Sequence, residues 1–79
     1  MKLELYHMEY CPFCKKVFRE IEQSGRSDIE YRDILKDKDN YRRLMDIGGL
    51  DQVPCLFIDG KPLYESNDII QWLRRHPQE

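Results

Sequence analysis

The sequence has 79 residues, which is enough for one small core, and we expect a single domain over residues 1–79. Its 13 Lys and Arg residues nearly balance 15 Asp and Glu residues, and the two signs are interspersed along the chain. This charge pattern provides neither a footprint for a nucleic acid nor a basic face for a membrane surface.

The number of cysteines indicates whether the protein resides in a reducing or an oxidising compartment. The chain has three cysteines, whereas scaffolds held by structural disulfides usually have an even number, so a reducing interior is favoured. The N-terminal segment carries charges within its apolar stretch and lacks the hydrophobic run of a secretory signal. No apolar run is long enough to span a bilayer. We therefore expect a cytoplasmic protein, and a monomer, because no long apolar surface stripe requires a partner.

The first element is a strand that leads into a cysteine pair. Leu3 and Leu5 alternate with charged or polar neighbours over residues 2–6, which is typical of a half-buried strand. The sequence Cys11-Pro12-Phe13-Cys14 follows. Apolar residues then recur at helical spacing from Pro12 to Ser24, and Gly25 is placed to end that helix.

Cys11 and Cys14 are the candidate catalytic residues. A thiol at the first turn of a helix faces unpaired N–H groups and the positive end of the dipole, which favour the reactive thiolate. Pro12 suits the first helical position, and Cys14 lies one turn further on, so the two sulfurs can form a reversible disulfide. The alternative is half of a zinc site, but only Cys55, His7 and His76 remain as ligands and no second close pair exists. We expect no metal.

The rest of the chain predicts three more strands and two more helices. Residues 29–34 alternate as a strand that runs parallel to the first, because a helix connects the two. A second helix begins within residues 37–40 and ends at Gly48-Gly49. Residues 53–58 and 62–64 predict a hairpin around Asp59-Gly60. Ser66 is the expected N-cap of a last helix that ends near Arg75.

This order, β-α-β-α-β-β-α, predicts an α/β protein with a four-stranded mixed sheet and three helices, the smallest form of the thioredoxin-like fold. The cysteine pair would lie at the carboxyl end of a parallel strand, where open α/β sheets bind their ligands.

These motifs resemble those of the glutaredoxins over nearly the whole chain. The resemblance rests on Cys11-Pro12-Phe13-Cys14 after the first strand, on Val53-Pro54 before the third, and on the segment from Tyr64 to Asp68 at the last helix. Residues 63–70 are even more similar to the N-terminal domain of glutathione transferases. The resemblance implies a thioredoxin-like fold and an enzyme that uses glutathione as a co-substrate, with no permanently bound cofactor.

The resemblance also assigns roles to single residues. It implies a cis peptide bond before Pro54, which exposes the backbone of Val53 to pair with the cysteine of glutathione. Ser66 and the N–H groups after it would bind the γ-glutamyl carboxylate, and Asp68 or Glu65 its ammonium group. The same residues can instead serve only to cap and charge the helix. Tyr10 and Phe13 flank the site and would form an apolar wall for the disulfide substrate, unless Phe13 instead packs against its own domain.

Two positions depart from the glutaredoxin pattern. Many glutaredoxins have a lysine three residues before the first cysteine, where it attracts the glycyl carboxylate of glutathione, but this chain has Met8 there. Possible substitutes are Lys15, Arg42, Arg43 and Gln52. The second departure is Cys55, which we interpret as a small buried side chain rather than a third redox thiol. His7 is interpreted as a capping or surface group rather than one that tunes the thiol.

The resemblance therefore implies a glutathione-dependent thiol-disulfide oxidoreductase that acts on protein disulfides and on glutathione mixed disulfides. One alternative is a redoxin that is reduced by a thioredoxin-reductase-type flavoprotein. Another is a binding protein for an iron-sulfur cluster, which Pro12 disfavours. A transferase is disfavoured because these residues do not include the helical second domain of that family.

Overall fold

The computed structural model describes residues 1–78 and contains one mixed sheet of four strands in the order β2-β1-β3-β4. Strand β1 (Leu3–His7) pairs in parallel with β2 (Ile29–Asp33) and antiparallel with β3 (Cys55–Ile58). Strand β4 (Lys61–Tyr64) completes a hairpin with β3. The parallel first pair and the hairpin were both predicted, and both are confirmed.

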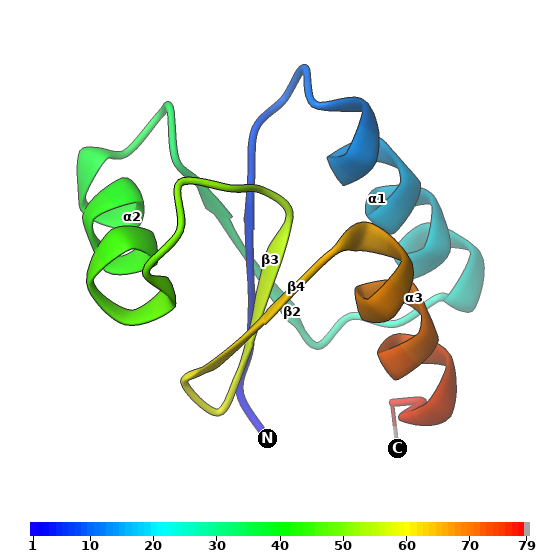
Figure 1. Cartoon of the computed structure of the whole chain (residues 1–79). Helices are drawn as coiled ribbons and strands as arrows, with labels where there is room; N and C mark the ends of the chain where they lie inside the picture. The colour runs from blue at the N-terminus through cyan, green and yellow to red at the C-terminus, as the bar shows by residue number, and fades with distance from the viewer. Residues whose placement is uncertain (79) are drawn as a thin grey trace.

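Helices cover both faces of this sheet (Figure 1). Helices α1 (Pro12–Ser24) and α3 (Ser66–Arg75) lie on one face, and α2 (Lys38–Arg43) with its π-helical continuation η1 (Leu44–Gly48) lies on the other. The order of elements is the predicted β-α-β-α-β-β-α. No helix within residues 1–78 has the length and apolar character needed to cross a membrane.

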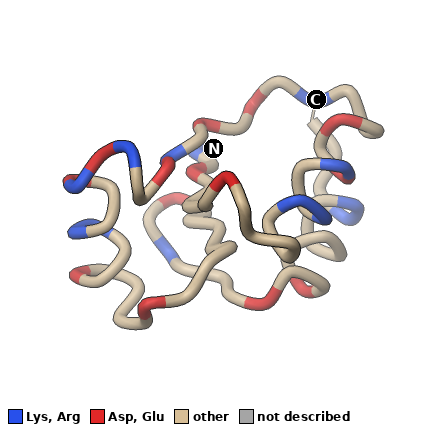
Figure 2. Tube along the Cα trace, turned by 90° about the horizontal axis from the view of Figure 1, so that it is seen from above, with Lys and Arg blue, Asp and Glu red and all other residues tan. Residues whose placement is uncertain are grey.

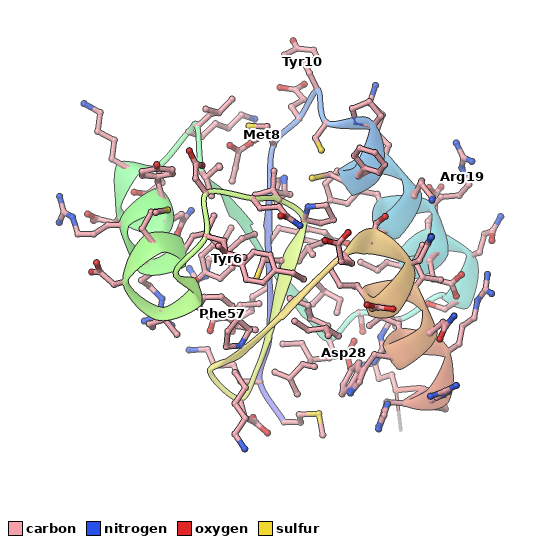
Figure 3. All side chains as sticks on the ribbon, viewed as in Figure 1. Tyr6, Met8, Tyr10, Arg19, Asp28 and Phe57 are labelled. Carbon is pink, nitrogen blue, oxygen red and sulfur yellow. The ribbon has the colours of Figure 1, made fainter. Side chains whose placement is uncertain are left out.

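The sheet separates two clusters of buried side chains. The cluster under α1 and α3 is aliphatic, and it consists of Leu3, Leu5, Val17, Ile21, Leu56, Ile69 and Leu73. The cluster under α2 and η1 consists of Tyr6, Ile34, Leu44, Cys55 and Phe57. The rings of Tyr6 and Phe57 lie 4.4 Å apart between the sheet and α2 (Figure 3). Apolar burial on both faces is the main force that holds the helices to the sheet.

The prediction of a half-buried first strand is wrong. Helices pack on both faces of the sheet (Figure 1), so both sets of alternating side chains of the inner strand β1 are covered. Glu4 and Tyr6, which the alternation assigned to solvent, are only 2% and 0% exposed. The alternation of apolar and polar residues in β1 therefore correctly separated an apolar set of side chains from a polar set. It did not predict that the polar set is buried as well.

The second predicted helix consists of two parts. Asp37 caps α2 by accepting a hydrogen bond from the Asp39 N–H, 2.9 Å away, as its place at the charged start of the helix predicted. From Leu44 the helix widens into the π form, and Gly49 ends it with φ 81°. The N–H of Gly49 points to the carbonyls of Leu44 and Met45, both at 3.1 Å. A left-handed φ of this kind is readily adopted by glycine.

Two predicted boundaries also change. The third strand begins at Cys55 rather than at Val53, because residues 53–54 form the turn that leads into it. Helix α3 has Glu65 as its N-cap, with φ 70°, and Ser66 is the first helical residue. Gly25 ends α1 as predicted, with φ 72° and its N–H donating to the Glu22 carbonyl.

Charged residues surround the fold. Figure 2 shows Lys and Arg positions together with Asp and Glu positions on both the α2 side and the α1/α3 side. Neither sign is gathered on one side of the chain, which agrees with the interspersed pattern of the sequence.

Candidate functional site

Cys11 stands at the start of α1, directly beyond the loop that leaves β1. It is the N-cap residue, with extended backbone angles, and Pro12 takes the first helical position as predicted. The Cys11 Sγ lies 3.8 Å from the carbonyl oxygen of Val53, which belongs to a segment 42 residues away. Cys11 is 8% exposed, and it opens onto a cavity of about 730 Å³.

Cys14 lies one turn further along α1 and is fully buried. It does not line the cavity. Burial, and to a smaller extent the neighbouring Cys11, raises the pKa of Cys14 well above its ordinary value. All three cysteines are free thiols in this structure. The two thiols of the motif therefore differ in access, since Cys11 faces the cavity and Cys14 lies behind it.

The cavity unites segments that are distant in the sequence. Its walls come from the end of β1, from α1, from the residues around Pro54 and from the start of α3. They are formed by Met8, Cys11, Phe13, Lys16, Ile34, Asp51, Gln52, Val53, Pro54, Glu65, Ser66, Asn67 and Asp68. Most of the residues that the sequence assigned to a binding site, Phe13, Val53, Pro54, Glu65, Ser66 and Asp68, are thus brought together around Cys11.

Tyr10 is the exception among the predicted wall residues. It does not line the cavity, and its side chain is 80% exposed. Figure 3 shows Tyr10 at the tip of the loop between β1 and α1, pointing away from the body of the molecule. Phe13 does line the cavity and is 59% exposed, so it forms an apolar part of the cavity mouth.

The segment before β3 presents its backbone to the thiol. The Val53–Pro54 peptide bond is cis, as the resemblance implied. The Val53 carbonyl faces the Cys11 sulfur, and both Val53 and Pro54 line the cavity. A main-chain group at this place can pair with the backbone of an extended ligand.

The start of α3 forms the opposite wall. Ser66 is 8% exposed, Asn67 and Asp68 follow it in the first turn, and all three line the cavity. The first N–H groups of a helix have no partner within the helix and attract anions. Glu65 points its carboxylate to the Gln52 amide, which donates to Oε1 at 3.1 Å. This wall thus contains donors for a carboxylate and acceptors for an ammonium group.

Four cavity residues were given no binding role by the sequence analysis: Lys16, Ile34, Asp51 and Asn67. The Lys16 Nζ donates to Asn67 Oδ1 at 3.0 Å, which links α1 to α3 beside the cavity. Helical spacing could have revealed Lys16, because it lies three residues after Phe13 and shares its face of α1. Asp51 lies in a loop without periodicity, so no local signal marks it.

Of the residues considered as substitutes for the missing lysine, only Gln52 lines the cavity. The side chain of Arg43 is instead bound to Tyr6 and Glu4 on the α2 face of the sheet, and Arg42 pairs with Asp39. Lys15 is exposed on α1 and does not line the cavity. The position itself is occupied by Met8, whose side chain is at the carboxyl end of β1 (Figure 3).

Cys55 and His7 lie outside the cavity. Cys55 is fully buried on the α2 face, and burial raises its pKa to about 11. The His7 ring lies edge-on to the rings of Phe18 and Tyr31, and neither ring nitrogen has a hydrogen-bond partner among the described residues. Burial lowers the pKa of His7. The interpretation of His7 as a capping or surface group is therefore wrong, because its ring nitrogens are buried.

Within residues 1–78, no three His, Cys, Asp or Glu side chains are grouped so that they could hold a metal ion. The chemistry available at the cavity is thus that of a thiol next to a backbone carbonyl, an apolar mouth and a helix N-terminus.

Comparison with known proteins identifies related sequences and folds. The family model described as glutathione S-transferase, N-terminal domain, matches residues 5–79. No curated protein matches the sequence. The structure of the thioredoxin-like protein BC3987 aligns with a TM-score of 0.79 at 26% identity, over 94% of this chain and 97% of that one.

Two further structures show the breadth of the similarity. A wheat glutaredoxin aligns with a TM-score of 0.69 at 26% identity, over 95% of this chain and 72% of its own. Glutathione transferase Omega 3C from Trametes versicolor aligns with a TM-score of 0.79 at 21% identity, over 100% of this chain and 36% of its own. The predicted thioredoxin-like fold is confirmed.

Proposed function

The chain belongs to the glutathione S-transferase N-terminal domain family, and from this premise we propose that it is a glutathione-dependent thiol-disulfide oxidoreductase with Cys11 as its nucleophile. The observation that carries the proposal is the position of the Cys11 sulfur. It lies at the N-terminus of α1, it faces the Val53 carbonyl, and it opens onto a cavity whose opposite wall is the N-terminus of α3.

In the proposed reaction, the Cys11 thiolate attacks the glutathione sulfur of a mixed disulfide. The old S–S bond breaks, the substrate leaves as a thiolate that takes up a proton, and glutathione stays on Cys11. The thiolate of a second glutathione then attacks this disulfide and leaves as oxidised glutathione, which restores Cys11. One mixed disulfide and one glutathione thus become one substrate thiol and one glutathione disulfide.

A protein disulfide substrate adds a role for Cys14. After Cys11 has formed a mixed disulfide with the substrate, Cys14 attacks it, releases the reduced substrate and closes the Cys11–Cys14 bond. Two glutathione molecules then reopen that bond. Cys14 is buried and held as a thiol in the resting state, so it acts only once Cys11 has become oxidised.

The cavity supports a specific binding mode for glutathione. The backbone of Val53 would pair with the cysteine residue of glutathione, as one rung of an added strand. The N-terminus of α3, with Ser66, would bind the γ-glutamyl carboxylate, and Asp68 or Glu65 the ammonium group. Phe13 would contact the disulfide from the cavity mouth. We propose that the protein acts as a monomer in the cytoplasm, on protein disulfides and on glutathionylated proteins.

The test is the rate at which the protein reduces a glutathione mixed disulfide in the presence of glutathione, glutathione reductase and its nicotinamide electron donor. We expect turnover that is lost in Cys11→Ser and kept in Cys14→Ser, because the single-thiol route does not use Cys14. Cys55→Ser is the matched control, since this thiol lies outside the cavity. Turnover that survives in Cys11→Ser would refute the assignment.

A second candidate function is favoured by Met8. None of the residues that line that end of the cavity is a cation, whereas many glutaredoxins have a lysine there that attracts the glycyl carboxylate of glutathione. A redoxin reduced by a flavoprotein reductase would not need it. Parallel assays with a thioredoxin reductase in place of glutathione distinguish the two: rapid reduction of the Cys11–Cys14 disulfide by the reductase alone would favour the second function.

A further inference from the structure

The cavity has two ends that differ in charge. At the α3 end, the charged residues are Lys16, Glu65 and Asp68. Here the Lys16 ammonium group and the free N–H groups of α3 offset the two carboxylates. At the other end, the lining residues are Met8, Ile34 and Asp51, and Asp51 is the one charged residue among them; Gln52 lies between the two ends, where it donates to Glu65.

Asp51 has no cationic side chain within ion-pairing distance among residues 1–78. Its side chain is exposed. The neighbouring group is the neutral hydroxyl of Tyr41, whose pKa is raised by desolvation and by the Asp51 carboxylate. A negative charge in a concave wall raises the local concentration of cations and lowers that of anions. Asp51, whose one close polar neighbour is the Tyr41 hydroxyl, can therefore attract a cation that occupies this end of the cavity.

We propose that Cys11 reacts preferentially with disulfides that carry a positive charge on the arm at the Met8 end, and that Asp51 is the specificity-determining residue. The proposal rests on the proposed thiol-disulfide function and adds the class of substrate. Cystamine, the disulfide of 2-aminoethanethiol, is the smallest probe with this chemistry, because each arm ends in an ammonium group two carbons from sulfur.

The reaction is the first step of the proposed cycle. The Cys11 thiolate attacks one sulfur of cystamine, the S–S bond breaks, and one molecule of 2-aminoethanethiolate leaves and takes up a proton. The other half stays on Cys11 as a mixed disulfide. The electron pair of the attacking sulfur forms the new bond and that of the broken bond leaves with the thiolate, so no further oxidant or reductant is needed.

The experiment compares three disulfides of similar size. They are cystamine, the neutral bis(2-hydroxyethyl) disulfide and the anionic 3,3′-dithiodipropionate. The second-order rate constant is measured with the reduced Cys14→Ser protein, from the appearance of the mixed disulfide on Cys11 by intact mass. The wild-type protein, followed by loss of the Cys11 and Cys14 thiols, gives an independent ranking. Each rate constant is divided by that of dithiothreitol with the same disulfide, which removes the intrinsic reactivity of the probes.

We expect the normalised rate for cystamine to exceed that for the dianion by about tenfold at low ionic strength. This ratio should fall toward one in about 1 M salt, where charges a few Å apart are screened. In Asp51→Asn the ratio should fall about threefold. Met8→Lys should lower the ratio, because a cation at this position favours the anionic probe. Glu22→Gln is the matched control, because Glu22 is an exposed carboxylate of α1 outside the cavity, and its ratio should equal that of the unaltered protein.

The outcomes separate this inference from the function on which it rests. Equal normalised rates for the three probes, or a ratio that Asp51→Asn leaves unchanged, would overturn the inference while the oxidoreductase assignment stands. If no disulfide reacts with Cys11, the proposed function fails, and the inference fails with it. Slow turnover with glutathione together with a high cystamine ratio would support the inference.

Discussion

The cluster of side chains buried under α1 and α3 is aliphatic and lies beside the buried Cys14 thiol of α1, whereas the face of the sheet under α2 and η1 buries a carboxylate, a phenol and a thiol. These three groups belong to Glu4, Tyr6 and Cys55, which are at most 2% exposed. On the α2 face, buried polar atoms need partners, because an unpaired polar group in the interior costs free energy. Their partners therefore determine how α2 sits on the sheet.

Two arginines provide the partners of Glu4 and Tyr6. The Arg43 side chain from α2 donates to the Tyr6 hydroxyl at 2.9 Å and pairs with Glu4 at 3.4 Å, while Arg32 from β2 pairs with Glu4 at 3.2 Å. Both arginine side chains are partly exposed, at 47% and 36%. Water thus solvates the cations while the carboxylate remains buried. The comparison teaches that the sheet face under α1 and α3 is covered mainly by aliphatic side chains, with polar contacts such as Glu20–Arg74 made between the two helices, whereas α2 is also bonded directly to polar groups of the sheet.

The largest effect on this comparison is expected from Arg43→Met. The change leaves the Glu4 carboxylate with one partner and the Tyr6 hydroxyl with none, so we expect a loss of about 2–4 kcal/mol in the free energy of unfolding. Arg42→Met is the control, because Arg42 pairs with Asp39 on the exposed surface and should cost less than about 1 kcal/mol. Urea unfolding of both variants measures the difference, and equal losses would contradict the role given to Arg43.

Gly48→Ala should have the next largest effect. A Cβ on Gly48 would collide with the Tyr64 hydroxyl, which bridges the N–H and carbonyl of Leu50. We expect a loss of about 1–3 kcal/mol from the displaced ring. In a Tyr64→Phe background the obstructing oxygen is gone, so Gly48→Ala should cost clearly less there. Thermal or urea unfolding of the four proteins in this cycle provides the measurement.

The Cys55 thiol should make the α2 face sensitive to alkali. Its pKa is raised from 9.0 to about 11, so above pH 9 the unfolded chain loses this proton before the folded one does. Stability from this group is complete below pH 9 and is lost as the pH rises toward 11, by about 1.4 kcal/mol at pH 10. Cys55→Ala should lose less stability than the unaltered protein between pH 8 and pH 10. If the free energy of unfolding decreases equally with pH in the two proteins, this effect of Cys55 is excluded.

His7 should give the smallest effect, on the other face of the sheet. Burial lowers its pKa, so as the pH falls below 6.5 the unfolded chain takes up the proton first and the folded state loses stability. We expect His7→Phe to remove this loss, which amounts to less than about 1 kcal/mol between pH 7 and pH 6. The phenyl ring also removes two unpaired nitrogens. The test is the free energy of unfolding of both proteins at several pH values. If it falls equally below pH 6.5 in both, His7 is not held neutral by the fold.

The sequence by itself determined the local elements of this protein. Helical spacing and Pro12 located α1 and put Cys11 at its N-terminus, and Asp59-Gly60 located the hairpin, because the interactions behind these signals lie within a few residues. The resemblance in the motifs added the residues that meet at the cavity, including Val53 and Ser66.

Only the tertiary structure decided which of these residues meet and which other residues join them. It buried Glu4 by packing α2 on that face of β1 (Figure 1), and it turned Tyr10 away from the cavity. It also brought Lys16 beside Asn67, 51 residues away in the sequence, and left Asp51 alone at the Met8 end. Contacts between distant segments depend on how helices and strands pack together, and no periodicity or motif within one segment contains that information.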